Sequence, residues 1–290
     1  MLGYFAANSD SFITGRFLGA TTLGFYNFAY QIPHLAETHI APVVNQVLFP
    51  VLSQVQDDRE RLRQGYLQSL RWIAVATLPF AVGLLVIAPE FVPVVYGEPW
   101  RPVILPLQIL CLSGLAHALT NSVWTVQQAV GRPEIGLWWG AALVPITIGT
   151  LIFSLRWGMV GIATAMLFLS VGSSLGIQAV TNRLIALSWG RWFKVIRIPI
   201  TAAVAMGLVS ALWRAMMLAE SFQAWMTLGT TVAVGIMSYV AGLLWMDRTL
   251  VDELRSLMPW TSGSARAAGA VDVTATVSRR LEIPLDAAER

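Results

Sequence analysis

The chain has 290 residues, of which 56% are hydrophobic by a count that leaves out its 23 glycines. Charged residues make up 12%, about half of the share found in an average soluble domain, and the mean hydropathy is +0.64. This composition excludes a water-soluble globular enzyme. The net charge of +3 is too small for a surface that binds nucleic acid.

The apolar stretches between charged residues predict membrane-spanning helices. A bilayer core of about 30 Å requires about 20 apolar residues per helix, and stretches of roughly this length recur along residues 1–246. We therefore predict an all-α integral membrane protein, a polytopic helical bundle of about eight transmembrane helices. In chain order the predicted spans are about 1–16, 23–50, 69–90, 103–130, 134–155, 158–182, 196–217 and 222–246.

The first two predicted spans are the least regular. The span at 1–16 is short for a crossing, and a turn at 19–22 separates it from the second span. Pro33, Pro42 and Pro50 lie within the second span, where each removes a backbone donor, so we expect kinks or a break there.

Residues 247–290 follow the last predicted span. Apolar residues recur at helical spacing in 247–260, which predicts either an amphipathic helix on the inner leaflet or a continuation of the last span. Residues 261–290 are rich in Ser, Gly, Ala and Thr, and we expect them to form a disordered cytoplasmic tail.

Lysine and arginine residues set the expected orientation, because they are enriched in cytoplasmic loops. If the spans alternate and the amino end is inside, four cationic residues fall on outer connections, namely Arg16, Arg101, Arg156 and Arg214. Eleven fall on the inner side, namely Arg59, Arg61, Arg63, Arg71, Arg132, Arg183, Arg191, Lys194, Arg197, Arg248 and Arg255. We therefore expect both termini, a loop at 57–64 and residues 186–194 to be cytoplasmic.

Polar and ionisable groups inside the spans are the candidate functional residues, because such groups are costly in a bilayer. Asp10 lies in the first span, His34 and Glu37 lie in the second, and His117 and Asn121 lie in the fourth. The two members of each pair share a helix face, and a carboxylate beside an imidazole can hold and release a proton. The alternative, that these groups reach the headgroup region, stays open.

Motifs for covalent or metal chemistry do not occur in the sequence. The string HLAETH at 34–39 places its histidines five residues apart instead of the four that a zinc-binding helix requires. No nucleophile elbow, Walker loop or dinucleotide-binding glycine motif is present. The single Cys111 lies in an apolar run and is interpreted as a buried small side chain. We therefore predict no enzyme activity, no metal site and no cofactor.

Three glycine pairs with a spacing of four residues predict close helix packing. They are Gly15 with Gly19, Gly136 with Gly140, and Gly172 with Gly176.

Several motifs, in a fixed order, carry a resemblance to a known family. The segment NSDSFITGRFLGATTLGFYNFAYQIP at 8–33 resembles the seventh-span signature of bacterial oligosaccharide flippases, the polysaccharide transporter branch of the MOP superfamily. Further segments resemble the second half of that family in the same order, namely NQVLFPVLSQVQDD at 45–58, YGEPWRP at 96–102, LQIL at 107–110 and QQAVGRPE at 127–134. The resemblance covers roughly residues 1–250.

The resemblance implies a transporter of two six-helix lobes, with 12 or 14 spans. Such a protein moves undecaprenyl-pyrophosphate-linked oligosaccharide across the bacterial inner membrane for the synthesis of lipopolysaccharide, exopolysaccharide and other polysaccharides. Only the second lobe is matched here, so we expect Met1 to fall inside a helix and a six-helix first lobe to be missing. A truncated reading frame, a domain fragment and half of a split protein are all consistent with this.

The same resemblance implies roles for candidate residues. Arg16 and Arg71 are candidates to bind the pyrophosphate, and Asp10, His34 and Glu37 are candidates for coupling to a proton or sodium gradient. Two other functions stay open. A polytopic glycosyltransferase or polymerase of the same pathway would need a large extracytoplasmic loop, whereas the longest outer connection is about 90–103. A drug exporter of the same superfamily would share the fold, and only the motifs quoted above argue against this alternative.

Overall fold

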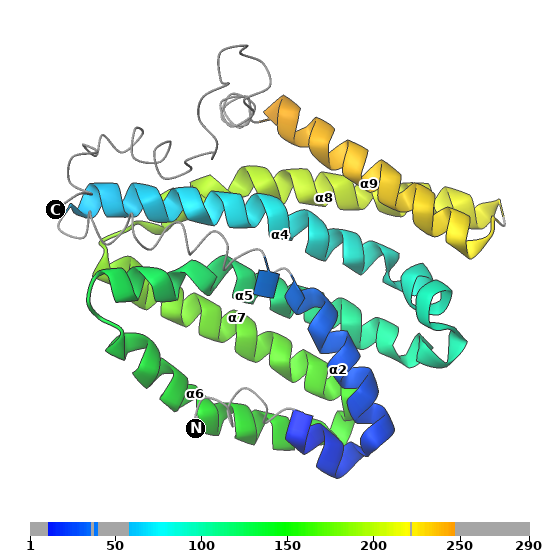
Figure 1. Cartoon of the computed structure of the whole chain (residues 1–290), viewed down its shortest axis with the longest axis horizontal. Coiled ribbons are helices and arrows are strands. Elements are labelled where there is room, and N and C mark those ends of the chain that lie inside the picture. The colour runs from blue at the N-terminus through cyan, green and yellow to red at the C-terminus, as the bar shows by residue number, and fades with distance from the viewer. Residues whose placement is uncertain (1–10, 36–37, 40–57, 221, 247–290) are drawn as a thin grey trace, which may run out of the picture.

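The structure is a computed structural model that describes residues 11–35, 38–39, 58–220 and 222–246. Within these ranges the chain forms helices and short connections and contains no strand. Figure 1 shows the helices lying alongside one another as a bundle. The predicted all-α class is therefore confirmed. Asp10, Glu37 and the predicted elements at 247–260 and 261–290 lie outside the described residues.

The helices follow one another with short connections. A first helix occupies 11–18, and α2 follows at Ala20–Leu35. The longer helices are α4 (Arg59–Tyr96), α5 (Ile104–Ala129), α6 (Glu134–Ser154), α7 (Gly158–Leu184), α8 (Trp189–Ala219) and α9 (Ala224–Met246). Two 3₁₀ turns connect them, η2 at Glu98–Val103 and η3 at Leu155–Trp157.

Five helical stretches of the described residues are long and apolar enough to cross a bilayer. One of them, Glu134–Leu184, contains both α6 and α7, which are joined by η3 and pack against each other. The helices α4 to α9 overlap the last six predicted spans, and the total number of crossings stays a prediction.

Two connections differ from the sequence-based expectation. The segment 57–64, expected to be a loop, is helical from Arg59 onward, because the Asp58 side chain accepts hydrogen bonds from the backbone N–H groups of Glu60 and Arg61 and caps the helix. At about 1.5 Å per residue the 38 residues of α4 extend about 57 Å, well beyond a bilayer core. The turn expected at 19–22 is confined to Gly19, whose φ of +86° suits a residue without a side chain.

The helices pack in two groups around α4 and α5 (Figure 1). On one side α4 packs against α8 and α9, with buried residues such as Tyr66, Leu70 and Trp192 in the core. On the other side α5 packs against α2 and α7, around residues such as Leu107 and Leu110, and α6 packs mainly on α7. Because α4 also packs against α5, the two groups form one bundle.

Large apolar side chains cover the outside of the bundle. Trp138 on α6 is 76% exposed, Phe168 on α7 is 76% exposed and Trp245 on α9 is 84% exposed. A water-facing surface would not tolerate such contiguous apolar area, whereas lipid does. The outer surface therefore agrees with a membrane-embedded bundle.

Candidate functional site

Two of the predicted candidates, His34 on α2 and His117 on α5, lie together in the structure. Their ring centroids are 5.6 Å apart, with an angle of 47° between the rings. The sequence analysis paired each histidine with a neighbour on its own helix. The packing of α2 against α5 instead pairs the two imidazoles with each other.

The orientation of His34 is set by its own helix. Its side chain is buried, with 7% exposed, and its ring stacks on Tyr30 with 4.0 Å between centroids. The ring atom Nδ1 lies 2.8 Å from the backbone oxygen of Tyr30. A carbonyl oxygen can only accept, so Nδ1 carries the hydrogen and Nε2 is the proton-accepting nitrogen of the neutral ring.

His117 belongs to a network of polar side chains between α5 and α7. Its Nε2 lies 3.0 Å from the hydroxyl of Ser170, which lies 2.7 Å from the hydroxyl of Ser113. One turn further along, the hydroxyls of Thr120 and Ser174 lie 3.1 Å apart. Although α5 and α7 are mainly apolar helices, the interface between them is polar next to the histidine pair.

This polar network continues toward the end of α7. Tyr66 donates to the amide oxygen of Gln178 at 2.8 Å, and Gln178 donates to Asn182 at 2.8 Å. The α7 residues that take part, Ser170, Ser174, Gln178 and Asn182, are spaced by four, so they form one stripe along the helix. All four are buried, and in lipid such groups need partners inside the bundle.

A close approach between α2 and α5 brings the histidines together. A Cβ atom on Gly114 would lie 3.0 Å from the backbone oxygen of Pro33 and 3.1 Å from its carbonyl carbon. Backbone atoms cannot rotate away as a side chain can, so a side chain at position 114 would require α2 and α5 to move apart by a few tenths of an ångström. Pro33 and Gly114 precede His34 and His117 by one and three residues, which makes this contact the structural basis of the pair.

The remaining predicted residues are distributed over three helices. Arg16 is exposed on helix 11–18 and makes no polar contact with either imidazole among the described residues. Arg71 on α4 and Asn121 on α5 are partly buried. With Asp10 and Glu37 outside the described ranges, a carboxylate partner for His34 stays a prediction.

An ion pair that the sequence analysis missed joins α4 to α8. The guanidinium Nε of Arg214 donates to both carboxylate oxygens of Glu90, at 2.8 Å each, and the Glu90 side chain is 9% exposed. From sequence, Glu90 is predicted to lie at a span boundary and Arg214 in an outer connection. The signal was present in the sequence, because Glu90 and Arg214 each end a long charge-free stretch.

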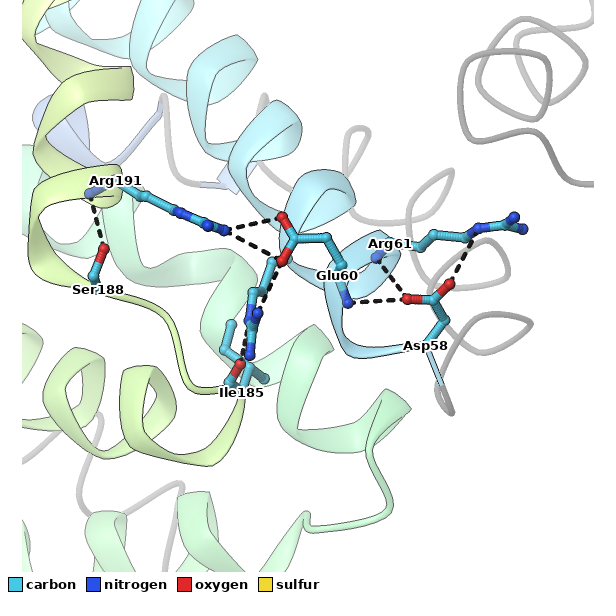
Figure 2. A network of polar contacts seen from close by, with 7 residues as sticks. Asp58, Glu60, Arg61, Ile185, Ser188 and Arg191 are labelled. Atoms are coloured by element: carbon cyan, nitrogen blue, oxygen red, sulfur yellow. Dashed lines mark hydrogen bonds and ion pairs between the residues drawn. The ribbon is translucent and has the colours of Figure 1, made fainter.

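A second ion pair joins the same two helices near their amino ends. Figure 2 shows Arg191 of α8 reaching Glu60 of α4, with Nη1 at 2.9 and 3.2 Å from the two carboxylate oxygens. Arg63 also donates to Glu60, at 2.8 Å. These hydrogen bonds, from Arg63 first and then Arg191, hold the pKa of the Glu60 carboxyl below its usual range. The two helices are therefore parallel and connected at both ends.

Comparisons with known proteins identify relatives in polysaccharide biosynthesis. Residues 1–105 match a family model described as polysaccharide biosynthesis protein. The teichuronic acid biosynthesis protein TuaB of Bacillus subtilis is 29% identical over 237 residues, which cover 81% of this chain and 49% of TuaB. The lipopolysaccharide biosynthesis protein WzxC of Escherichia coli is 33% identical over 135 residues, or 47% of this chain and 27% of WzxC.

A longer alignment and a solved structure cover most of the chain. The succinoglycan biosynthesis transport protein ExoT of Rhizobium meliloti is 24% identical over 280 residues, which cover 94% of this chain and 56% of ExoT. The chain thus spans about half of the length of TuaB and ExoT. The lipid II flippase MurJ, in an inward closed conformation, has the same fold, with a TM-score of 0.67 and 15% identity over 86% of this chain and 52% of MurJ. The resemblance to polysaccharide biosynthesis transporters is confirmed, while the assignment to their second half stays a prediction. The chain is a bacterial membrane protein related to polysaccharide biosynthesis proteins, with the helical fold of a flippase.

Proposed function

We propose that the chain forms one lobe of a transporter that moves a lipid-linked oligosaccharide across the bacterial inner membrane for polysaccharide synthesis. The observation that carries this proposal is its relatedness to polysaccharide biosynthesis proteins, ExoT among them, along nearly its whole length. A flippase-like fold and an exterior of apolar side chains support it. Such a transporter breaks no bond in its substrate, so it needs binding groups and a conformational change but no catalytic residue.

The exposed face of the first two helices supports the need for a second lobe. Thr21, Gly24 and Gln31 are exposed on α2 at spacings of three and seven residues, which places them on one face, and Arg16 is exposed just before it. A charged guanidinium is costly in contact with lipid. In our proposal this face lines a water-filled cavity against a second lobe of similar size, where Arg16, with Arg71, binds the diphosphate of the substrate.

We further propose that His34 and His117 couple transport to a proton gradient. Two imidazoles 5.6 Å apart repel each other when both are charged, so in our proposal the pair carries one proton at a time through the transport cycle. Sodium, the other ion considered, prefers several oxygen ligands to imidazole nitrogen, so the geometry favours the proton.

Complementation of a flippase-null strain tests the transport proposal. Expressed alone, this chain should insert in the membrane without restoring polysaccharide export, and co-expression with a six-helix first lobe should restore it. Failure of the two lobes together, at normal protein levels, would contradict the proposed function. Export by this chain alone would instead indicate a homodimer with one lobe from each copy.

The coupling proposal is tested in the same strain with the restored transporter. His34→Ala and His117→Ala should each abolish export while the protein still accumulates, as should the variants Asp10→Ala and Glu37→Ala if a carboxylate takes part. His39→Ala is the matched control, because this third histidine is exposed. Normal export by both His34→Ala and His117→Ala would contradict a coupling role while leaving the transport proposal intact.

A further inference from the structure

The amino-terminal part of α8 carries cations that the rest of the described chain does not neutralise. At this end of the bundle three carboxylates are paired with arginine: Asp58 with Arg61, Glu60 with Arg63 and Arg191, and Glu134 with Arg132. Lys194 and Arg197 form no ion pair with any residue that the structure describes, and both are exposed.

These two cations lie on one open face of the helix. Gly190, Phe193, Lys194 and Arg197 have the spacing of a single helix face, and all four are exposed. A Cβ atom on Gly190 would meet nothing within 4 Å. The face turns away from the core of the bundle, which Trp192 enters from the opposite side with only 6% of its surface exposed.

Beyond Thr201, whose hydroxyl donates to the backbone oxygen of Ile198, the same face is apolar toward the other end of α8. Val204 is 51% exposed, Leu208 is 63% exposed and Leu212 is 68% exposed, and they continue the helical spacing that begins at Arg197. We name the whole surface, from Gly190 to Leu212, the α8 stripe. It presents cations and an aromatic ring at one end and branched aliphatic side chains along the rest.

The position of the charges along α8 corresponds to a membrane boundary. No charged residue lies between Arg197 and Arg214, a distance of about 26 Å along the helix, which is close to the thickness of the bilayer core. Exposed Trp189 and Phe193 lie beside the cations, as expected where aromatic residues meet the headgroups. Long cationic side chains here reach the phosphates while their stems stay in the apolar region.

We propose that the α8 stripe binds an anionic phospholipid, with its phosphodiester held by Lys194 and Arg197 and an acyl chain lying along Val204, Leu208 and Leu212. Charge complementarity favours an anionic headgroup over a zwitterionic one. The aliphatic continuation favours a lipid over free phosphate or a polar protein surface. The proposal does not depend on the transport function, because it concerns a lipid-facing surface and not the face that carries Arg16.

Thermal unfolding of the purified full chain in neutral detergent tests the proposal. Short-chain phosphatidylglycerol should raise the midpoint of unfolding, followed by tryptophan fluorescence, whereas short-chain phosphatidylcholine and inorganic phosphate should raise it much less. The double variant Lys194→Gln/Arg197→Gln should lose most of the response, and added salt should weaken the response of the unchanged protein. Equal responses to the two lipids, or a response to inorganic phosphate equal to that of phosphatidylglycerol, would overturn the proposal.

Two further variants distinguish binding at the α8 stripe from a general effect of the net charge of the protein. Arg101→Gln/Arg156→Gln also removes two exposed positive charges, from η2 and η3, and should keep the response to phosphatidylglycerol. Lys194→Arg/Arg197→Lys preserves both charges of the α8 stripe and should also retain the response to phosphatidylglycerol. Loss of the response in the η2/η3 variant, or its full retention in Lys194→Gln/Arg197→Gln, would contradict specific binding. Should the glutamine variant fail to fold, the comparison between the two lipids still decides the outcome.

Discussion

Most carboxylates in this bundle pair with an arginine, and two of them, Glu60 and Glu90, reach arginines more than 120 positions away in the sequence. Of the six carboxylates that the structure describes, five pair with arginine, and the exposed Glu220 forms no ion pair with a described residue. The pair between Glu90 and Arg214 is the most buried of these. Removing one member of a buried pair leaves an uncompensated charge, which costs more than the pair itself contributes.

Substitutions in the Glu90–Arg214 pair should destabilise the bundle. We expect Arg214→Gln to lower the free energy of unfolding by about 1–3 kcal/mol, since the Glu90 carboxylate then lacks its partner and Arg214 is itself partly exposed. The double variant Glu90→Gln/Arg214→Gln should be less destabilised than the sum of the two single variants. Unfolding in a denaturing detergent titration measures this. Glu98→Gln, which breaks a pair with 68% and 64% exposed side chains, is the control and should change little. Strict additivity of the two single effects would contradict a direct interaction.

At the scale of whole helices, small residues decide which elements can approach closely. In each predicted glycine pair a Cβ atom added to only one member would lie within 4 Å of a neighbouring side chain: Leu23 at Gly15, Trp124 at Gly136 and Trp139 at Gly176. Gly19, Gly140 and Gly172 have nothing within that distance. An added Cβ would meet backbone atoms of another segment at Gly114 and at Gly161, neither of which belongs to such a pair. The spacing of glycines alone therefore does not identify all of the glycines that lie at close contacts between helices.

A side chain at position 114 should separate α2 from α5. We expect Gly114→Val to cost about 1–3 kcal/mol, the typical cost of overpacking, because the added atoms would meet the Pro33 backbone. Gly140→Val, at an open position, is the matched control. The same detergent titration measures both. If the two variants are equally stable, the close approach of α2 and α5 does not require glycine.

Across the whole molecule, the two ion pairs between α4 and α8 define the ends of the bundle. Glu60 and Arg191 lie at one end, and Glu90 and Arg214 lie at the other. Three helices, α5, α6 and α7, lie between α4 and α8 in the chain, and the parallel direction of α4 and α8 agrees with the alternation assumed from the charge distribution. The distribution of positive charges predicts that the Glu60–Arg191 end faces the cytoplasm.

Cysteine labelling should reveal this orientation. In a Cys111→Ala background, single cysteines replacing the exposed Gln64 or Ser188 should resist a membrane-impermeant thiol reagent in intact cells, while one replacing the exposed Glu98 should react. Positions 64 and 188 both lie near the Glu60–Arg191 end of the bundle, so cysteines at the two positions should show the same resistance to the reagent. Permeabilised cells provide the control, in which all three should react. Labelling of Gln64 or Ser188 from outside would contradict the predicted topology.

Much of the fold is determined by the sequence read locally. Apolar runs of 20 or more residues must be helical in a bilayer, because every backbone donor then needs a partner within its own segment. This reasoning predicts the helical class, and the motifs, by their order along the chain, indicate relatives among polysaccharide transporters. It failed at 57–64, where clustered arginines suggested a loop although Asp58 caps a helix through them. Charge marks where a span leaves the membrane, and not where a helix begins.

The candidate site was decided by tertiary structure. Local spacing paired His34 with Glu37 and His117 with Asn121, because only neighbours on one helix can be recognised from sequence. The contact between His34 and His117, and the ion pair between residues 124 positions apart, depend on which helices pack together and in what rotation. That choice results from complementary shape at points such as Gly114 against Pro33. Hydrophobicity drives each helix into the bilayer whatever its neighbours are, whereas the partner of a polar group depends on how the helix faces fit against each other.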